Sequence, residues 1–254
     1  LALTQRKILI TAALPYANGD IHLGHLVEYL QTDIWSRFQK MRGHECLYFC
    51  ADDTHGTPIM IGAKQKGISP EQLIADCHSK HLQDFTDFQI EFDEFHSTNA
   101  PESKETVEDI FNKIKAKGLV TVKPVKQPYC ENDKMFLPDR FVIGTCPKCK
   151  SEKQYGDSCD VCGSTYNPNE LIEPQCSVCG TPPVQKSSDH VFYKLEPSRE
   201  FLKTWVNEHT NKGVSKKLME WLDGELKDWD ISRDAPYFGF EIPGHPNKFF
   251  YVWA

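Results

Sequence analysis

Apolar positions in the first half of the chain follow an alternation of strands and helices. An apolar, β-favouring run at residues 8–10 is followed by apolar positions at helical spacing. Those positions are Leu23, Leu26, Val27, Leu30, Ile34 and Phe38. The predicted elements after the first strand are a helix at His22–Met41, a strand at His44–Cys50, and helices at about Pro58–Lys66, Pro70–Phe88 and Glu102–Lys117. A strand, helix and strand of these lengths predict a right-handed parallel crossover and an α/β fold.

The pattern changes after Gly118. From Leu119 to about Pro183, short β-favouring pieces, prolines and cysteines replace the helical spacing. Two further helices are predicted at about Ser198–Asn211 and Val214–Asp228, before a strand-like FFYVW. We therefore expect a Rossmann-like domain over residues 1–117, an insertion over 118–230, and a return to the first domain over 231–254.

Length and composition are those of a globular enzyme. A chain of 254 residues can bury a sizeable core, and 39% hydrophobic residues with mixed charge are ordinary for a folded protein. Because the sequence shows neither a membrane-spanning apolar run nor a signal peptide, we expect a cytoplasmic protein with no membrane partner. The formal net charge of −7 argues against broad, non-specific binding to nucleic acid, although it leaves a local surface open.

Cysteine spacing predicts a structural metal site. Six of the ten cysteines fall in C-x-x-C pairs, and nine residues separate the first two pairs, with Gly156 and Gly163 at the bends. The predicted ligands are Cys146, Cys149, Cys159 and Cys162. Four thiolates suit tetrahedral Zn²⁺ and leave no position for a substrate. A redox C-x-x-C is the competing interpretation, but it needs one pair at a helix N-terminus.

A second zinc site is a further hypothesis. The third pair, Cys176 and Cys179, has no matching C-x-x-C, but Cys130 and Asp133 form a C-x-x-D upstream, which gives a Cys₃Asp set. The alternative is a knuckle with free thiols that has lost its metal. The remaining cysteines are interpreted as core thiols: Cys46, Cys50 and Cys77.

The segment Lys7–His25 carries the strongest chemical signal. A strand breaks at Pro15, turns through Gly19 and opens a helix with His22 and His25 in its first turn. A helix N-terminus attracts anions, imidazoles add directional donors, and Gly24 between them lets a nucleotide approach the backbone closely. This pattern indicates a nucleotide-phosphate site and nucleotidyl transfer. The alternative is an ordinary pair of surface histidines on a helix.

The motif in this segment resembles that of a known family. P-x-x-N-G-x-x-H-x-G-H resembles the HIGH signature of class I aminoacyl-tRNA synthetases. With ALPYANG in front, ADDTHGTP at Ala51–Pro58 and WDISRDAPYFG at Trp229–Gly239, the chain resembles the methionyl-tRNA synthetases over essentially its whole length. The resemblance implies the nucleotide-binding (HUP-type) fold of class I synthetases, incomplete here, with an inserted α+β connective-peptide domain whose zinc knuckles lie at about 128–183. It also implies that L-methionine and ATP with Mg²⁺ react to methionyl-adenylate, which then aminoacylates tRNA(Met).

The resemblance also implies residue roles. The expected catalytic residues are His22, His25, Asp53 and Arg233, of which the two histidines contact the ATP phosphates. The expected ATP site also includes Thr11, Pro15, Asn18 and Gly24. The expected methionine pocket is formed by Ala13, Leu14, Tyr16, Asp53 and Trp253. Taken alone, Tyr16 and Trp253 fit core packing and Arg233 a surface ion pair, while Asp52 is the near alternative to Asp53 as the ammonium partner.

The departures from the family matter as well. The KMSKS loop and the anticodon-reading domain are not in this sequence, so we expect a piece of a longer protein that is inactive alone and could oligomerise through C-terminal parts. Two rival hypotheses are a zinc-ribbon module that binds RNA or protein, and a small-molecule adenylyltransferase, a class of enzyme that shares the H-x-G-H motif. Three lysines could contact the acceptor stem of tRNA, but we expect them on a solvated helix face: Lys212, Lys216 and Lys217.

Overall fold

The computed structural model describes residues 4–253, which divide into two compact units. The first unit comprises residues up to 111 with 237–240 and 252–253, and the second comprises 112–236 and 241–251. The predicted ranges 1–117, 118–230 and 231–254 stay a prediction, and residues 1–3 and 254 lie outside the described part. Within that part, no helix has both the length and the apolar character that crossing a membrane requires.

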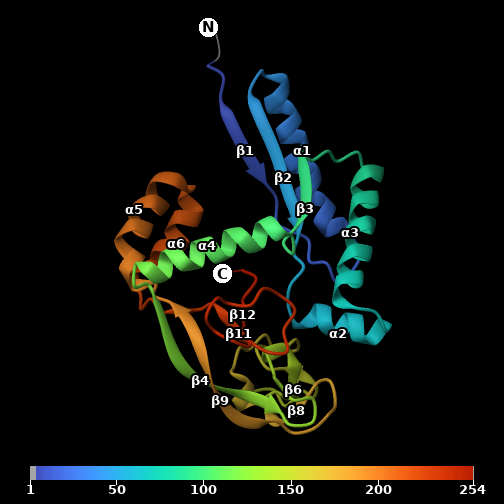
Figure 1. Ribbon diagram of the computed structural model, residues 1–254, viewed down its shortest axis with the longest axis vertical. Coiled ribbons are helices and arrows are strands. Elements are labelled where there is room, and N and C mark those ends of the chain that lie inside the picture. Colours follow the sequence, from blue (N-terminus) through green and yellow to red (C-terminus); the bar gives the residue numbers. More distant parts are fainter. Residues whose placement is uncertain (1–3, 254) are drawn as a thin grey trace. The chain divides into compact units, whose positions relative to one another are not determined.

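A parallel sheet forms the centre of the first unit (Figure 1). Its strands are β1 (Lys7–Thr11), β2 (Glu45–Asp52) and β3 (Glu94–Ser97), in the order β1-β2-β3. Both strand pairs are parallel, with Leu9 opposite Leu47 and Cys50 opposite Phe95. The predicted α/β fold with a parallel sheet is thereby confirmed. In such sheets ligands bind at the carboxyl ends of the strands, where the segments after Thr11 and Asp52 begin.

Among the described residues, four helices belong wholly or partly to the first unit. They are α1 (Leu23–Met41), α2 (Thr57–Lys66), α3 (Pro70–Asp87) and α4 (Pro101–Ala116), the last of which runs into the second unit. Tyr29 of α1 and Phe85 of α3 pack edge to face with ring centroids 4.9 Å apart, in one core cluster with Tyr48 of β2. Ser69 accepts a hydrogen bond from the Gln72 N–H at 3.1 Å and is the N-cap of α3.

The buried face of α1 differs from the apolar positions of the sequence pattern. Leu23 and Phe38 are 77% and 52% exposed, and Val27 and Ile34 are exposed as well. The buried stripe is Leu26, Tyr29, Asp33, Ser36 and Gln39. Asp33 can be buried in this stripe because its carboxylate accepts from Arg37 at 2.7 Å and from the Glu91 N–H at 3.1 Å.

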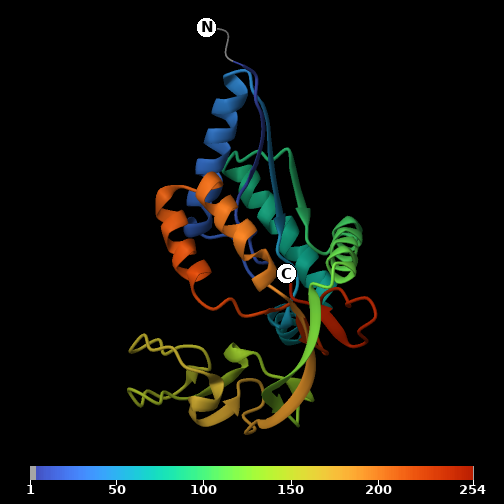
Figure 2. The same ribbon diagram turned by 90° about the vertical axis from the view of Figure 1, so that its left-hand side faces the viewer.

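A long antiparallel ribbon organises the second unit (Figures 1 and 2). Strand β4 (Val120–Cys130) pairs with β9 (Val184–Tyr193), and β10 (Trp229–Asp230) and β5 (Met135–Phe136) extend this sheet in the order β10-β9-β4-β5. At one end of the ribbon lies an antiparallel sheet of β7 (Gln154–Tyr155), β6 (Val142–Thr145) and β8 (Ile172–Cys176). Short 3₁₀ turns occur at Asp139–Phe141, Pro168–Glu170 and Glu196–Ser198.

A helix pair follows the ribbon in sequence. Helices α5 (Arg199–His209) and α6 (Lys212–Asp223) share a core with Leu226. The prediction that the second helix reaches residue 228 is wrong, because it ends at Asp223 with Gly224 as its C-cap. Strand β11 (Ser232–Asp234) pairs with β12 (Lys248–Phe250), so the strand predicted over FFYVW also stops early, at Phe250.

Candidate functional site

The two histidines of the H-x-G-H segment cap helix α1 reciprocally. His22 is the N-cap, its Nδ1 accepts from the His25 N–H at 3.3 Å, and His25 Nδ1 accepts from the His22 N–H at 3.3 Å. The rings stack with centroids 3.7 Å apart and planes 13° apart. Because each Nδ1 accepts a hydrogen bond, each neutral ring carries its proton on Nε2. Two N–H donors are therefore held at a helix N-terminus, where anions are favoured.

The stacked pair leaves little room beside Gly24. A Cβ on Gly24 would lie 3.0 Å from Cε1 and 3.1 Å from Nδ1 of the His22 ring. Burial, with a contribution from the neighbouring charge of His22, lowers the pKa of His25, which favours its neutral form. The glycine thus has a role within the protein itself, whatever it contributes to the approach of a nucleotide.

Asp53 offers an open carboxylate oxygen at the end of β2. Its backbone is fixed by a β-bridge to Tyr16, with the Asp53 N–H donating to the Pro15 carbonyl at 2.8 Å. Asp53 Oδ2 accepts from the Trp253 indole N–H at 3.0 Å, whereas the buried Oδ1 has no hydrogen-bond partner among residues 4–253. Burial raises the pKa of Asp53. A buried acceptor without a partner is costly, so this oxygen is a place for a donor from a ligand.

Asp52, the alternative considered from the sequence, is fully engaged by the protein. Its side chain is completely buried, and its two oxygens accept from Nδ1 of His78 and Nδ1 of His81, each at 2.6 Å. Adjacent residues of a strand point to opposite faces, so the two carboxylates meet different surroundings. Of the two, only Asp53 keeps an oxygen that is free for a ligand.

The other residues predicted for the methionine pocket also lie in the first unit. The Tyr16 hydroxyl donates to the His55 carbonyl at 2.9 Å, and burial raises the pKa of Tyr16. Trp253 is 71% exposed and therefore is not a core residue. The Ala13 backbone is fixed by α1, since its N–H donates to Glu28 at 2.6 Å and its carbonyl accepts from the Tyr29 hydroxyl at 2.7 Å. Leu14 is exposed.

The predicted nucleotide-side residues lie at the end of β1 and in the loop that leads into α1. Thr11 is the last residue of β1 and is exposed, and Asn18 is exposed in the following loop, where its N–H donates to the Tyr16 carbonyl at 2.8 Å. Sequence reasoning missed Glu28 and the two histidines of α3. The signal for His78 and His81 is their i, i+3 spacing on a predicted helix, which places both on one face.

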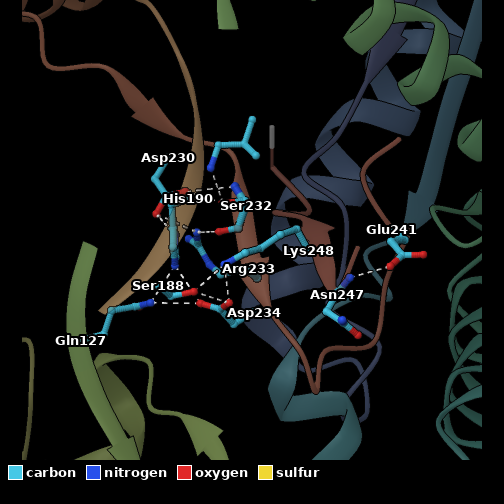
Figure 3. A network of polar contacts seen from close by, with 11 residues as sticks. Gln127, Ser188, His190, Asp230, Ser232, Arg233, Asp234, Glu241, Asn247 and Lys248 are labelled. Atoms are coloured by element: carbon cyan, nitrogen blue, oxygen red, sulfur yellow. Dashed lines mark hydrogen bonds and ion pairs between the residues drawn. The ribbon is translucent and has the colours of Figure 1, made fainter. Parts of the chain in front are cut away.

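Arg233 belongs to the second unit and lies beside a buried charge network (Figure 3). Its guanidinium carbon lies 4.1 Å from the centroid of the Tyr251 ring, and its Nη1 donates to the Ser232 carbonyl at 2.6 Å. It also approaches Asp230 at 3.8 Å, an ion pair of the kind the sequence left open as the alternative. Since Arg233 and Asp53 belong to different units, the action of Arg233 on that carboxylate stays a prediction.

His190 is the centre of the network in Figure 3. Its buried ring lies between two carboxylates, with Nδ1 2.6 Å from Asp230 and Nε2 2.8 Å from Asp234. Burial alone would lower the pKa of His190, but these hydrogen bonds outweigh it and raise the pKa. Burial would likewise raise the pKa of Asp234, yet contacts with His190, Lys248 and Ser188 lower it to about 2.

The four cysteines of the first knuckle pair converge. Their sulfur atoms all lie within 4.8 Å of one another, with Cys146–Cys162 at 3.9 Å and Cys149–Cys159 at 3.5 Å. Tetrahedral zinc with Zn–S of about 2.3 Å needs sulfur separations of about 3.8 Å, so the donor set fits that metal. Hydrogen bonds to Ser151 lower the pKa of Cys149 to about 6, toward the thiolate that binds metals.

The knuckle backbone supports a metal site rather than a redox pair. Among the described residues neither pair begins a helix, as a redox C-x-x-C requires. Gly163 has φ +68° at one predicted bend. At the other bend, a Cβ on Gly156 would lie 2.6 Å from the Asp139 carbonyl oxygen, so only glycine fits there.

The second proposed ligand set also converges. Asp133 Oδ2 lies 3.2 Å from the sulfur of Cys130 and 3.3 Å from that of Cys176, and Cys130 and Cys179 are 3.4 Å apart. The four ligand atoms lie within 4.8 Å of one another. Cys130 ends β4 and Cys176 ends β8, so these residues meet only through the fold. Three sulfurs and one carboxylate oxygen are a set that zinc accepts.

Comparisons with known proteins agree on one family. The family described as "tRNA synthetases class I (M)" matches residues 8–254. A methionine–tRNA ligase of Bdellovibrio bacteriovorus is 58% identical over 251 residues, which are 98% of this chain and 36% of that protein. One of Francisella tularensis subsp. holarctica is 57% identical over 251 residues, covering 98% of this chain and 37% of that protein. The chain thus spans little more than a third of the length of these curated relatives.

A solved structure shows the same fold. The crystal structure of Mycobacterium tuberculosis methionyl-tRNA synthetase bound by methionyl-adenylate matches with a TM-score of 0.72 at 20% sequence identity. The match covers 98% of this chain and 45% of that chain. At this identity the likeness concerns the fold alone, and it agrees with the parallel sheet and helices of the first unit.

Proposed function

Because the chain belongs to the methionyl-tRNA synthetase family of class I synthetases, we propose that it carries the site where L-methionine and ATP react to methionyl-adenylate. The methionyl group then passes to tRNA(Met). The observation that carries this proposal is the buried, unpartnered Oδ1 of Asp53, which lies at the end of β2 and is joined through Tyr16 to the loop that leads into the capped histidines. The carboxyl ends of neighbouring parallel strands lie at one edge of the sheet, so both features belong to one site.

The chemistry of this step depends on positioning and charge stabilisation. A carboxylate oxygen of methionine attacks the α-phosphorus of ATP, and pyrophosphate leaves. The Nε2–H groups of His22 and His25 donate to phosphate oxygens as negative charge builds up in the transition state, and the N-terminus of α1 adds its dipole. We assign Thr11, Pro15, Asn18 and Gly24 to the border of the nucleotide, which enters with Mg²⁺.

The methionine side of the site is assigned by its donors and its walls. Asp53 Oδ1 would accept from the substrate ammonium group, which supplies the missing partner. Ala13, Leu14 and Tyr16 would form one wall and Trp253 the other, and a sulfur–aromatic contact is worth about 0.3–1.5 kcal/mol. Arg233 would orient the substrate or the Asp53 carboxylate.

Two structural zinc ions complete the proposal. Cys146, Cys149, Cys159 and Cys162 would hold the first, and Cys130, Asp133, Cys176 and Cys179 the second. Zinc bound in closed sites of this kind stabilises a segment that is poor in apolar residues. The knuckles would belong to a connective-peptide insertion over residues 118–230.

The test is methionine-dependent exchange of pyrophosphate into ATP, measured on the natural protein and its variants. Asp53→Asn keeps an acceptor for Trp253 but removes the charge, so kcat/KM for methionine should fall about ten- to hundred-fold. His25→Ala should lower kcat instead. Asp87→Asn is the matched control, because among the described residues the exposed Asp87 accepts only from the Gln83 amide, at 2.8 Å. A wild-type protein that binds RNA but shows no exchange would support the zinc-ribbon hypothesis and refute this one.

A further inference from the structure

A buried hydrogen-bond chain lies beneath the loop that precedes the capped histidines. His81 of α3 is 1% exposed, and its Nδ1 lies 2.6 Å from Oδ1 of Asp52. Its Nε2 lies 2.8 Å from the carbonyl oxygen of Gly19. One turn earlier on the same helix, His78 donates to the other oxygen of Asp52 at 2.6 Å. Of the two histidines, only His81 reaches the loop.

The partners of His81 determine its protonation. A carboxylate and a backbone carbonyl can only accept hydrogen bonds, so both ring nitrogens of His81 donate and the ring is an imidazolium. The proton shared with Asp52 stays on the ring because imidazole, with a pKa of about 6.5, is a stronger base than a carboxylate, with about 3.9. Burial alone would lower the pKa of His81, but the contacts with Asp52 and Gly19 outweigh it and raise the pKa.

The charge of His81 acts on the surrounding elements. Asp52 on β2 faces it directly, Asp84 on its own helix adds a negative charge, and His25 on α1 responds to it. Together with burial and with the charge of His22, the positive charge of His81 lowers the pKa of His25. In a neutral His25 ring Nδ1 can accept from the His22 N–H, so its one proton lies on Nε2. The His81 cation also adds positive potential near a site proposed for phosphates.

We propose that His81 is a positioning residue of the adenylation site. As a buried imidazolium held by Asp52, it fixes the Gly19 carbonyl and thereby the loop that presents His22 and His25 to the phosphates of ATP. This inference rests on the function proposed above. It assigns a part of the site to α3, far along the chain from the H-x-G-H segment.

The test compares His81→Gln with the matched variant His78→Gln. Both remove an imidazole that donates to Asp52, but only the first removes the link to Gly19. In methionine-dependent pyrophosphate exchange, His81→Gln should lower kcat at least about tenfold and leave KM for methionine within about twofold. His78→Gln should leave both constants within about twofold of wild type. Equal losses in the two variants would overturn the proposal, because Asp52 would then need its partners only for stability.

A second measurement does not depend on activity. In ¹⁵N spectra of the histidine rings of the wild-type protein, one ring besides that of His190, which also lies between two carboxylates, should have both nitrogens protonated at about pH 7, above the usual histidine pKa of about 6.5. Its signal should be the one that disappears in His81→Gln. A neutral His81 ring at that pH overturns the proposal. Absence of exchange in the wild type, with His81 found as an imidazolium, would instead contradict the proposed function.

Discussion

At the scale of single residues, the site depends on which polar atoms the fold satisfies. Asp52 and Asp53 are adjacent carboxylates, yet Asp52 receives two histidine donors while Asp53 keeps one buried oxygen without a partner. The imidazoles of His22 and His25 likewise use Nδ1 for capping, which leaves Nε2 for a ligand. Groups that the protein satisfies are structural, and those it leaves open are the ones available for chemistry.

Gly24 gives a prediction at this scale. Gly24→Ala places a methyl group 3.0 Å from the His22 ring and should displace it, lowering kcat of pyrophosphate exchange about tenfold. Alanine also favours the helix by about 0.5–1 kcal/mol, so thermal unfolding should show no loss of stability. Gly213→Ala, at the equivalent position in the first turn of α6, is the control, because a Cβ there comes no closer than 3.5 Å to a neighbour, the Asn211 Oδ1. Equal activity of the two variants would contradict the role assigned to the stacked pair.

At the scale of elements, capping residues mark where a helix begins or ends more precisely than apolar spacing does. Ser69 caps α3 through its own side chain, and Pro70 follows at the first helical position, so both signals lie next to each other in sequence. Helix α6 ends five residues before its predicted end, at Asp223. Its apolar spacing continues to Leu226, which joins the core of the helix pair from outside the helix. Apolar spacing therefore reports burial and not helix length.

The second cysteine knuckle joins two strands, and we expect its zinc to depend on each of its ligands. Metal analysis of the purified protein should find two zinc equivalents per chain, and one in Cys176→Ala, because that variant removes a ligand that joins β8 to the end of β4. Cys77→Ala should keep both, since Cys77 is a buried thiol of another core cluster. One equivalent in both the wild type and Cys176→Ala would rule out the second site.

At the scale of the whole molecule, buried charge makes stability depend on pH. His190 has a raised pKa in the folded protein, so its stabilising effect is complete below the unfolded value of about 6.5 and is lost as the pH rises through the folded value. Asp234 has a pKa lowered to about 2, so its effect is present above about 3.9 and is lost as the pH falls toward 2. The network therefore stabilises the fold most between about pH 4 and 6.5.

The corresponding measurement is urea unfolding of the wild type and of His190→Gln. The difference in unfolding free energy between them should be largest near about pH 6 and should shrink as the pH rises above about 7. Taking the difference removes the contributions of groups that both proteins share, such as His81. A difference that grows with pH would mean that His190 is neutral in the fold.

The sequence by itself determined the types of the elements, the knuckle spacing and the family. These features are local: Ile8–Ile10 has strand propensity, Ser69 is a cap, and the H-x-G-H segment and the C-x-x-C pairs lie within a few residues. Only the tertiary structure decided that α1 buries Tyr29 and Asp33 rather than Leu23 and Phe38, and that His81 lies under Gly19. Periodicity tells which side chains share a face. Whether a side chain is buried, charged or left with an unpaired hydrogen-bonding atom depends on neighbours that are distant in the sequence.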